Sequence, residues 1–562
     1  MNEFVTYLNT LHNYKAQNSN SYAERNIKSQ YYNDIKVNIR ICDFLERKLL
    51  GDTSQIVVLT GYAGDGKTSV MAQVIDNLTE DGFVDDKQHE YELSNGTKCV
   101  CVKDFSELSQ TDRKPIFENA INSVSNDKMV FMVANTGPLI NTFGEMYDES
   151  VSEKAKIELI DLMDENSGET RCIQNIMISV INIANIDNTY FSIEFLDNII
   201  NNKLWVECES CAKKSYCHIN SNRQLICNNR DKVKRFLKMH YTWLAENGRR
   251  LTIRSMAEQL AFMITGGFSC DNIPQIDRYK LMFVNLFFGY IGTRNNNKAL
   301  NIVAIKEAQN CRYDEKRLRA DEILLIRKDY SKVFGVEETK IIKEAADKDA
   351  FEEKFNAFVR RAYIFLNINT DDSTIAKDDE DIFSRQFMHY IEVRNGESDN
   401  LSPYKVLVRD ALSMLYIGTV GNASAIPLTL TRRTGISQNV QLITGWLETK
   451  NIQIVLKNAD DTNFDKTSNK KNIVLKINKE EIEQRLTLPI LDYFDELKNG
   501  ILSTQIDPQL SHGVESLKAQ IQDKVLKDLD EGDAEGFEMI ILKNKQSESI
   551  QLRIADKKIH MN

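Results

Sequence analysis

The chain has no hydrophobic run long enough to cross a membrane. Its most apolar stretch, residues 281–291, is shorter than the roughly 18 residues that a membrane-spanning helix needs, and polar residues interrupt it. The N-terminal sequence M-N-E-F also lacks the basic and apolar regions of a signal peptide. These absences predict a cytoplasmic protein that does not associate with membranes.

The chain also lacks an excess of positive charge. It carries 71 Lys and Arg residues against 82 Asp and Glu residues, so its formal net charge is −11. This balance argues against a protein coated with nucleic acid, although a local basic groove for DNA is compatible with it. One basic cluster could line such a groove or form an ordinary solvated helix face: Arg230, Lys232, Lys234, Arg235 and Lys238.

A complete phosphate-loop pattern, G-x-x-x-x-G-K-[ST], lies at residues 61–69. A β-branched run precedes it and apolar residues at helical spacing follow it, as the pattern requires. The glycines let backbone N–H groups surround a phosphate, Lys67 reaches the β- and γ-phosphates, and the Thr68 hydroxyl completes a Mg²⁺ shell. The sequence therefore predicts that ATP and Mg²⁺ bind at Gly61, Tyr62, Ala63, Gly64, Asp65, Gly66, Lys67, Thr68 and Ser69.

Further apolar runs at 99–102, 129–134 and 176–181 predict strands, and helical segments separate them. This alternation is typical of an α/β fold with a parallel sheet flanked by helices. We therefore expect a P-loop NTPase core with a zinc-stapled helical lid and an α+β C-terminal region. The expected divisions are an N-terminal helical segment (1–50), the ATPase core (51–200), the cysteine cluster and lid (201–330), a charged helical segment with an acidic, solvated linker (331–400), and a partner-binding region (401–562).

Polar residues follow two of the predicted strands. Asp104 is the candidate for holding Mg²⁺, because a hydrolytic site needs a carboxylate at the end of a strand near the loop. The alternative is that Asp104 caps a helix. Asn135 is the candidate sensor of the γ-phosphate, and its alternative is an ordinary turn residue in N-T-G-P.

Arginines follow further along the chain. Thr252 can cap a helix whose first turn carries Arg254, which could reach the phosphates from a lid or could be exposed on the helix. Arg249, Arg250 or Arg294 could serve a neighbouring subunit as an arginine finger, so a homo-oligomer is compatible with the sequence.

Four of the ten cysteines fall within twenty residues: Cys208, Cys211, Cys217 and Cys227. In a reducing cytosol such a cluster is more typical of a metal site than of disulfides. Tetrahedral Zn²⁺ is the expected occupant, with either Cys227 or His218 as the fourth ligand. An iron–sulfur cluster and free thiols are the alternatives.

Taken in order, these motifs resemble the AAA+-like ATPases of bacterial defence islands, and they are most similar to the DptF family of DNA phosphorothioation-dependent restriction systems. The resembling segments are the phosphate loop, K-D-F-S-E (103–107), V-A-N-T-G-P-L-I-N-T-F (133–143), V-I-N-I-A-N (180–185), Trp205 ahead of C-x-x-C, and T-I-R-S-M (252–256). The resemblance implies an ATP-hydrolysing subunit of a restriction or antiphage complex that acts with partner subunits on DNA. The alternative is a nucleotide-gated, STAND-like switch or scaffold that binds ATP with little turnover. A small-molecule kinase is not favoured, because the sequence shows no acceptor site.

Overall fold

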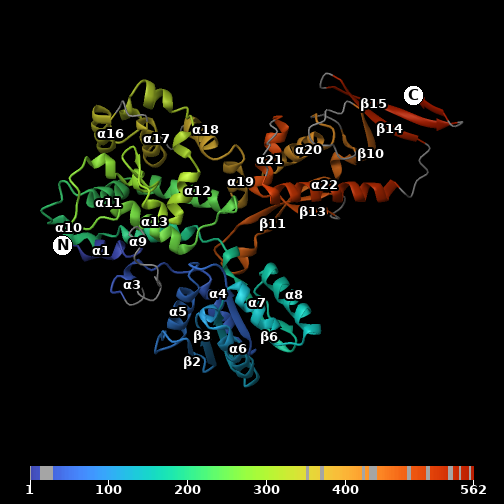
Figure 1. Cartoon of the computed structure of the whole chain (residues 1–562). Coiled ribbons are helices and arrows are strands. Elements are labelled where there is room, and N and C mark those ends of the chain that lie inside the picture. Colours follow the sequence, from blue (N-terminus) through green and yellow to red (C-terminus); the bar gives the residue numbers. More distant parts are fainter. Residues whose placement is uncertain are drawn as a thin grey trace. The chain divides into compact units, whose positions relative to one another are not determined.

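The protein forms two compact units in the computed structural model (Figure 1). The structure describes residues 2–12, 29–349, 354–367, 373–419, 424–429, 440–477, 482–500, 507–529, 536–543, 546–555 and 558–561. Unit 1 comprises Met1–Ile382 and Asp460–Ser468, and unit 2 comprises Phe383–Ala459 and Asn469–Asn562. Unit 1 therefore contains a short segment, residues 460–468, whose neighbours in the sequence belong to unit 2.

A six-stranded sheet organises unit 1, in the order β2-β3-β4-β1-β6-β5. The four inner strands run parallel, whereas the edge strands run antiparallel to their neighbours. The strands are β1 Ile56–Thr60, β2 Gln88–Glu92, β3 Lys98–Val102, β4 Met129–Val133, β5 Arg171–Ile173 and β6 Ile176–Asn182. The predicted α/β fold is confirmed here, and the predicted apolar runs form the parallel strands of a sheet that is mixed overall.

Helices cover both faces of this sheet, because successive side chains of each strand point to opposite faces. Val57 and Leu59 of β1 pack in one core with α4 Cys42–Leu49 and α5 Lys67–Leu78. Ile56 and Val58 pack in a second core on the opposite face, with α6 Gln110–Ser125, α7 Thr136–Gly144 and α8 Glu149–Glu165.

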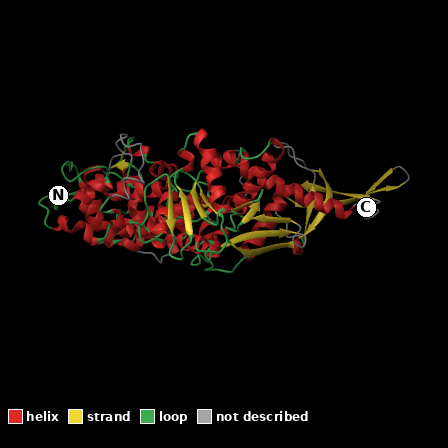
Figure 2. Ribbon diagram, turned by 90° about the horizontal axis from the view of Figure 1, so that it is seen from below, coloured by secondary structure: helices red, strands yellow, loops and turns green. Residues whose placement is uncertain are grey.

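The rest of unit 1 is mainly helical (Figures 1 and 2). Its helices are α1 Glu3–Leu8, α3 Tyr32–Ile35, α9 Tyr190–Ile199, α10 Val206–Glu209, α11 His218–Asn228, α12 Arg230–Glu246, α13 Ile253–Thr265, α14 Phe283–Leu286, α15 Val303–Asn310, α16 Val336–Asp349, α17 Phe355–Leu366 and α18 Ser373–Ile382. A two-stranded sheet, β7 Tyr290–Ile291 with β8 Arg294–Asn295, lies among them in the sequence. No helix in the described ranges is long and apolar enough to span a membrane.

The acidic run at 370–381 differs from the solvated linker that its composition suggests. Residues 370–372 lie outside the described residues, and the remainder forms α18. Asp378 and Asp379 are buried, at 0% and 6% exposure. Asp378 accepts hydrogen bonds from the Arg319 and Ala320 backbone N–H groups and from the Tyr363 hydroxyl. These carboxylates are buried because they cap and pair with other elements, which a charge count along the sequence does not reveal.

Unit 2 is rich in strands. Its five-stranded antiparallel sheet has the order β16-β15-β14-β10-β9, and a separate sheet has the order β11-β12-β13. The strands are β9 Ala425–Thr429, β10 Val440–Glu448, β11 Ile452–Asn458, β12 Lys471–Ile477, β13 Ile482–Arg485, β14 Gly536–Lys543, β15 Gln546–Ala555 and β16 Lys558–Met561, and the helices are α19 Phe387–Arg394, α20 Ser402–Tyr416, α21 Leu488–Lys498 and α22 Pro508–Leu529. The predicted mixture of helices and strands in the C-terminal region is confirmed.

Candidate functional site

A cavity of about 1080 Å³ lies in unit 1 at the carboxyl edge of the parallel strands. Residues from the loop 61–69 and the ends of β3 and β4 line it, together with α9, the start of α13, residues 36–43 and residues 464–467. Lys67, Thr68, Asp104, Asn135 and Arg254, which the sequence singles out separately, all line this one cavity. Parallel strands bring their carboxyl ends to the same edge, which explains why residues so far apart in sequence meet here.

The loop adopts a conformation that depends on glycine. Gly64 and Gly66 have φ angles of +90° and +84°, a region that other residues rarely adopt. A Cβ atom on Gly64 would lie 3.1 Å from the Thr252 hydroxyl, so the side-chain-free backbone also allows a close approach by the start of α13. Asp65 closes the loop by accepting the Tyr62 backbone N–H at 2.9 Å.

Lys67 lies against its own loop. Its ammonium donates to the Gly61 carbonyl at 3.0 Å and to the Tyr62 carbonyl at 2.8 Å. Burial lowers the pKa of Lys67, and the charges of Asp65 and Asp104 oppose that effect. A cation that burial desolvates, and whose hydrogen bonds go to two carbonyl groups, would bind an anionic group in the cavity favourably.

Thr68 and Asp104 meet directly. The Thr68 hydroxyl donates to the Asp104 carboxylate at 3.3 Å, although the two residues come from α5 and from the end of β3. The loop follows β1 and Asp104 follows β3, and β4 lies between these two strands in the sheet, so the contact passes over the end of β4. Asp104 is itself in the left-handed region, at φ +52°, and its second oxygen pairs with Lys103 at 3.3 Å. A hydroxyl and a carboxylate at this separation form a suitable partial ligand set for Mg²⁺.

Asn135 stands at the end of β4, between the ends of β1 and β3. It is the residue before α7, and its backbone N–H donates to the Ser106 hydroxyl at 2.6 Å. The sequence N-T-G-P therefore begins a helix in this fold. The amide of Asn135 lines the cavity next to the loop, where a sensor of bound phosphate would have to lie.

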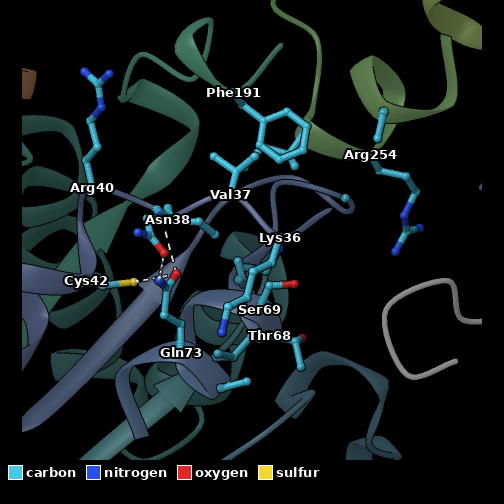
Figure 3. Close-up of a pocket in the computed structure, with 18 of the residues that line it drawn as sticks. Lys36, Val37, Asn38, Arg40, Cys42, Thr68, Ser69, Gln73, Phe191 and Arg254 are labelled. Atoms are coloured by element: carbon cyan, nitrogen blue, oxygen red, sulfur yellow. Dashed lines mark hydrogen bonds between the residues drawn. The ribbon is translucent and has the colours of Figure 1, made fainter. Parts of the chain in front are cut away.

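Two contacts fix the start of α13 on the loop. The Arg254 backbone N–H donates to the Gly64 carbonyl at 3.2 Å, and the Arg250 guanidinium pairs with Asp65 at 2.8 Å. Thr252 caps α13 by accepting the Ser255 N–H, as predicted. Figure 3 shows the Arg254 side chain extending from α13 at one side of the pocket. Arg250 also donates to the Ile183 carbonyl, so it is engaged within its own chain and does not have the exposure expected of a finger for a neighbouring subunit.

The wall formed by residues 36–43 had no recognisable signal in the sequence. Gln73 of α5 holds it: its side-chain carbonyl accepts the Ile39 N–H at 3.2 Å, and its amide donates to Asn38 at 3.0 Å. Figure 3 shows Val37 and Phe191 bordering the pocket together with Thr68 and Ser69. Val37 and Ile39 give this wall an apolar part, while Lys36, Asn38 and Arg40 make the rest of it polar.

The segment 460–468 forms a further wall that sequence reasoning missed. Phe464 is buried against Phe44, with ring centroids 5.0 Å apart. Asp465 pairs with Arg40 at 3.1 Å, and Arg40 also lies 4.0 Å from the Tyr190 ring centroid. Lys466 and Thr467, which follow, line the cavity.

The cysteine cluster is divided by α11. Cys217 precedes the helix and Cys227 lies near its far end, so ten residues at 1.5 Å rise separate them by about 15 Å. Two sulfurs on one zinc ion are less than about 4.6 Å apart, so Cys227 cannot join Cys217 in the predicted set. His218 bonds to the Thr265 carbonyl at 3.1 Å through Nε2, and burial lowers its pKa to about 4. As the side chains stand, no group of three or more His, Cys, Asp or Glu residues in the described part of the chain is arranged to hold a metal ion.

The basic cluster on α12 is largely paired within unit 1. Arg230 and Lys234 both contact Asp197 at 2.7 Å, and Arg235 contacts Asp379. These ion pairs favour the solvated-helix interpretation over a DNA groove at this place.

The sequence matches no protein-family model and none of the curated proteins. The interpretation of the cavity therefore rests on its own geometry and on the order of the motifs.

Proposed function

We propose that this chain binds ATP with Mg²⁺ in the cavity and hydrolyses it. The observation that carries the proposal is the contact between Thr68 and Asp104 beside Lys67. A glycine-rich turn with a structural role needs no hydroxyl paired with a carboxylate from a strand two places away in the sheet. The same three groups are those that phosphoryl-transfer sites use to hold a triphosphate and its metal ion.

Each residue has a defined task in this proposal. The N–H groups of residues 63–68 and the start of α5 hold the β-phosphate, and Lys67 exchanges its two carbonyl partners for phosphate oxygens. Thr68 and Asp104 hold Mg²⁺. Asn135 and Arg254, which both line the cavity, contact the γ-phosphate. Glu107 also lines the cavity and is a carboxylate available to orient the attacking water.

Apolar residues of the cavity lining provide a place for the base. They are Val37, Ile39, Phe191 and Ile253. A planar base can pack between such side chains while the backbone of residues 36–40 supplies polar contacts to its edge. The cavity volume is in the range typical of small-molecule sites.

We infer the biological setting from the resemblance. The order of motifs supports an AAA+-like subunit of a bacterial DNA restriction or antiphage complex of the phosphorothioation-linked type, working in the cytoplasm. Arg230, Lys234 and Arg235 of α12 are paired within the chain. We therefore favour contact with DNA through partner subunits rather than direct contact with DNA through α12. A homo-oligomer stays compatible with the proposal.

The test uses the full chain and a matched pair of lysine variants. Lys67→Ala should lose ATP turnover and bind a fluorescent ATP analogue far more weakly, whereas Lys128→Ala should behave as the wild type. Lys128 pairs with Glu90 at 2.7 Å and does not line the cavity. Wild-type turnover in Lys67→Ala would refute the site assignment.

A second function, a nucleotide-gated switch with little turnover, is favoured by one observation. Residues 464–467 line the proposed nucleotide cavity, and they belong to the segment 460–468, whereas the strands that precede and follow this segment, β11 and β12, belong to unit 2. A change in the position of residues 460–468 when nucleotide binds would therefore act through the chain on β11 and β12. Steady-state turnover with and without DNA and partner subunits separates the two functions: a motor turns over repeatedly, whereas a switch binds ATP and hydrolyses it poorly.

A further inference from the structure

Three of the clustered cysteines lie close to a fourth from a distant part of the sequence. The Asn2 side-chain amide donates to the Cys208 sulfur at 3.5 Å, and the Cys270 thiol donates to the Asn2 backbone carbonyl at 3.8 Å. A single residue therefore contacts two thiols that are 62 positions apart in the sequence (270 − 208). Cys270 follows α13, and no other cysteine lies close enough in the sequence to form a metal-ligand spacing motif with it.

The loop that contains Cys211 and Cys217 is attached to the same place. Lys213 lies between these two cysteines, and its ammonium donates to the Cys270 carbonyl at 2.8 Å. His218, immediately after Cys217, packs edge-on against Phe268 with ring centroids 5.3 Å apart. Both ends of the loop thus contact the few residues that lead to Cys270.

The thiol electrostatics agree with this placement. Burial raises the pKa of the Cys217 thiol, and Cys270 and Cys208 raise it further. Burial likewise raises the pKa of Cys270, with Cys208 and Cys211 contributing. For Cys227 burial also raises the pKa, but the charged neighbours are Arg223 and Arg230 rather than other thiols. The contacts through Asn2 and Lys213 place Cys270 with Cys208 and the loop of Cys211 and Cys217, whereas Cys227 lies near the far end of α11.

We propose that Cys208, Cys211, Cys217 and Cys270 form a four-thiolate zinc site. The side chains as they stand are not drawn together around one point, and a bound ion would bring each sulfur to about 2.3 Å from it. Zinc binds thiolates, so each thiol would release its proton to solvent when the ion binds, and the divalent cation would stabilise the four negative charges that then lie together. Lys213 and Lys214 supply positive charge beside the site, and the Asn2 amide provides an outer hydrogen bond to Cys208 of the kind that tunes metal thiolates.

The site would have a structural role. It would join the segment from α10 to α11 with the residues that follow α13, and the other end of α13 contacts the Gly64 carbonyl. The proposed zinc site shares no residue with the cavity lining and is therefore independent of nucleotide chemistry.

Metal content of the purified full-length chain tests the proposal. Wild-type protein prepared with zinc should contain about one zinc ion per chain. Cys270→Ser should lose most of it, whereas Cys227→Ser should keep it in full. Loss of zinc in Cys227→Ser, retention in Cys270→Ser, absence of zinc from the wild type, or iron in its place would overturn the assignment.

A second measurement uses the wild-type chain, in case Cys270→Ser does not fold. In the zinc-loaded protein, a thiol-alkylating reagent should spare Cys208, Cys211, Cys217 and Cys270, and it should modify the exposed Cys172. Stripping the metal with a chelator should make the four protected thiols reactive together, as peptide mass spectrometry would show. Equal labelling of Cys270 with and without the chelator would refute its role as a ligand.

Discussion

The ion pair between Arg250 and Asp65 should be the main attachment of α13 to the glycine-rich loop. The Asp65 side chain is fully buried, and the Arg250 side chain is 18% exposed. Arg250 additionally donates to the Ile183 and Ile186 carbonyls, at 3.0 and 3.3 Å. Arg250→Ala would remove these contacts and leave Asp65 with the Tyr62 N–H as its remaining hydrogen bond among those described here.

The loss of unfolding free energy in Arg250→Ala follows from the burial of Asp65. Removing one partner of a buried ion pair leaves an uncompensated charge and typically costs about 3–5 kcal/mol. Because Arg250 retains some solvent contact, we expect a value near the lower end, about 3 kcal/mol. That is a large share of the roughly 5–15 kcal/mol that stabilises a typical native domain. The double variant Asp65→Ala/Arg250→Ala should be less destabilised than the sum of the single variants, because it leaves no charge unpaired.

Urea denaturation followed by tryptophan fluorescence can measure this effect in unit 1. Trp205 and Trp243 report on unit 1, and replacing Trp446 with Phe removes the tryptophan of unit 2. The control is Arg249→Ala, because Arg249 makes a longer, more exposed pair with Glu307, at 3.7 Å. Exposed pairs contribute about 0–1 kcal/mol, so this neighbouring arginine should be nearly neutral. Equal small effects of the two variants would refute the attachment.

Four other outcomes are expected. Lys67→Ala should abolish turnover and weaken nucleotide binding, measured by phosphate release and by titration with a fluorescent ATP analogue. Asp104→Asn should still bind ATP through the loop but turn it over at a small fraction of the wild-type rate, because Mg²⁺ loses its carboxylate; normal turnover would place the metal ligand elsewhere. Burial raises the pKa of Glu258, on α13, to about 7, and Arg254 opposes this effect. Ionisation of this carboxyl should therefore destabilise unit 1 progressively as the pH rises from about 4.5 to 7. Glu258→Gln should raise the urea midpoint at pH 8 and leave it nearly unchanged at pH 4. Phe464→Ala should loosen residues 460–468 and increase their amide hydrogen exchange, and unchanged exchange would show that the aromatic contact with Phe44 does not hold them.

Local sequence patterns predicted the four inner strands of the central sheet, because these strands are buried on both faces, whereas the more exposed edge strands β2 and β5 were not predicted. Such strands read as unbroken apolar runs, as in I-V-V-L-T (56–60) and M-V-F-M-V (129–133), and each was followed by a helix. The ends of these strands then determine where Asp104 and Asn135 lie, since parallel strands end at one edge. For this part of the site, a residue that directly follows a predicted parallel strand can be placed at the carboxyl edge of the sheet from the sequence alone.

The other walls of the site depend on contacts between segments that carry no pattern. Residues 460–468 are polar apart from Phe464, and nothing in their sequence indicates that this side chain packs against Phe44. The acidic run near Asp378 had the composition of a linker, yet its carboxylates are buried by partners more than fifty residues earlier. The C-x-x-C pattern identified two neighbouring cysteines, whereas Cys270 could not be associated with them before the fold brought it near Asn2.

If ATP binds as proposed, the connection between the loop and α13 links nucleotide binding to the helical part of unit 1. The Gly64 carbonyl accepts the Arg254 N–H, and the Asp65 side chain accepts the Tyr62 N–H while holding Arg250. When Lys67 leaves the Gly61 and Tyr62 carbonyls for a phosphate, those carbonyls lose their cation and the loop between them and Asp65 must adjust. A shift at Gly64 then either carries the start of α13 with it or breaks its hydrogen bond. Both attachments lie within four residues of α13's first turn, so we expect nucleotide binding to act first on the start of this helix, where Arg254 is the side chain that would move toward or away from the γ-phosphate.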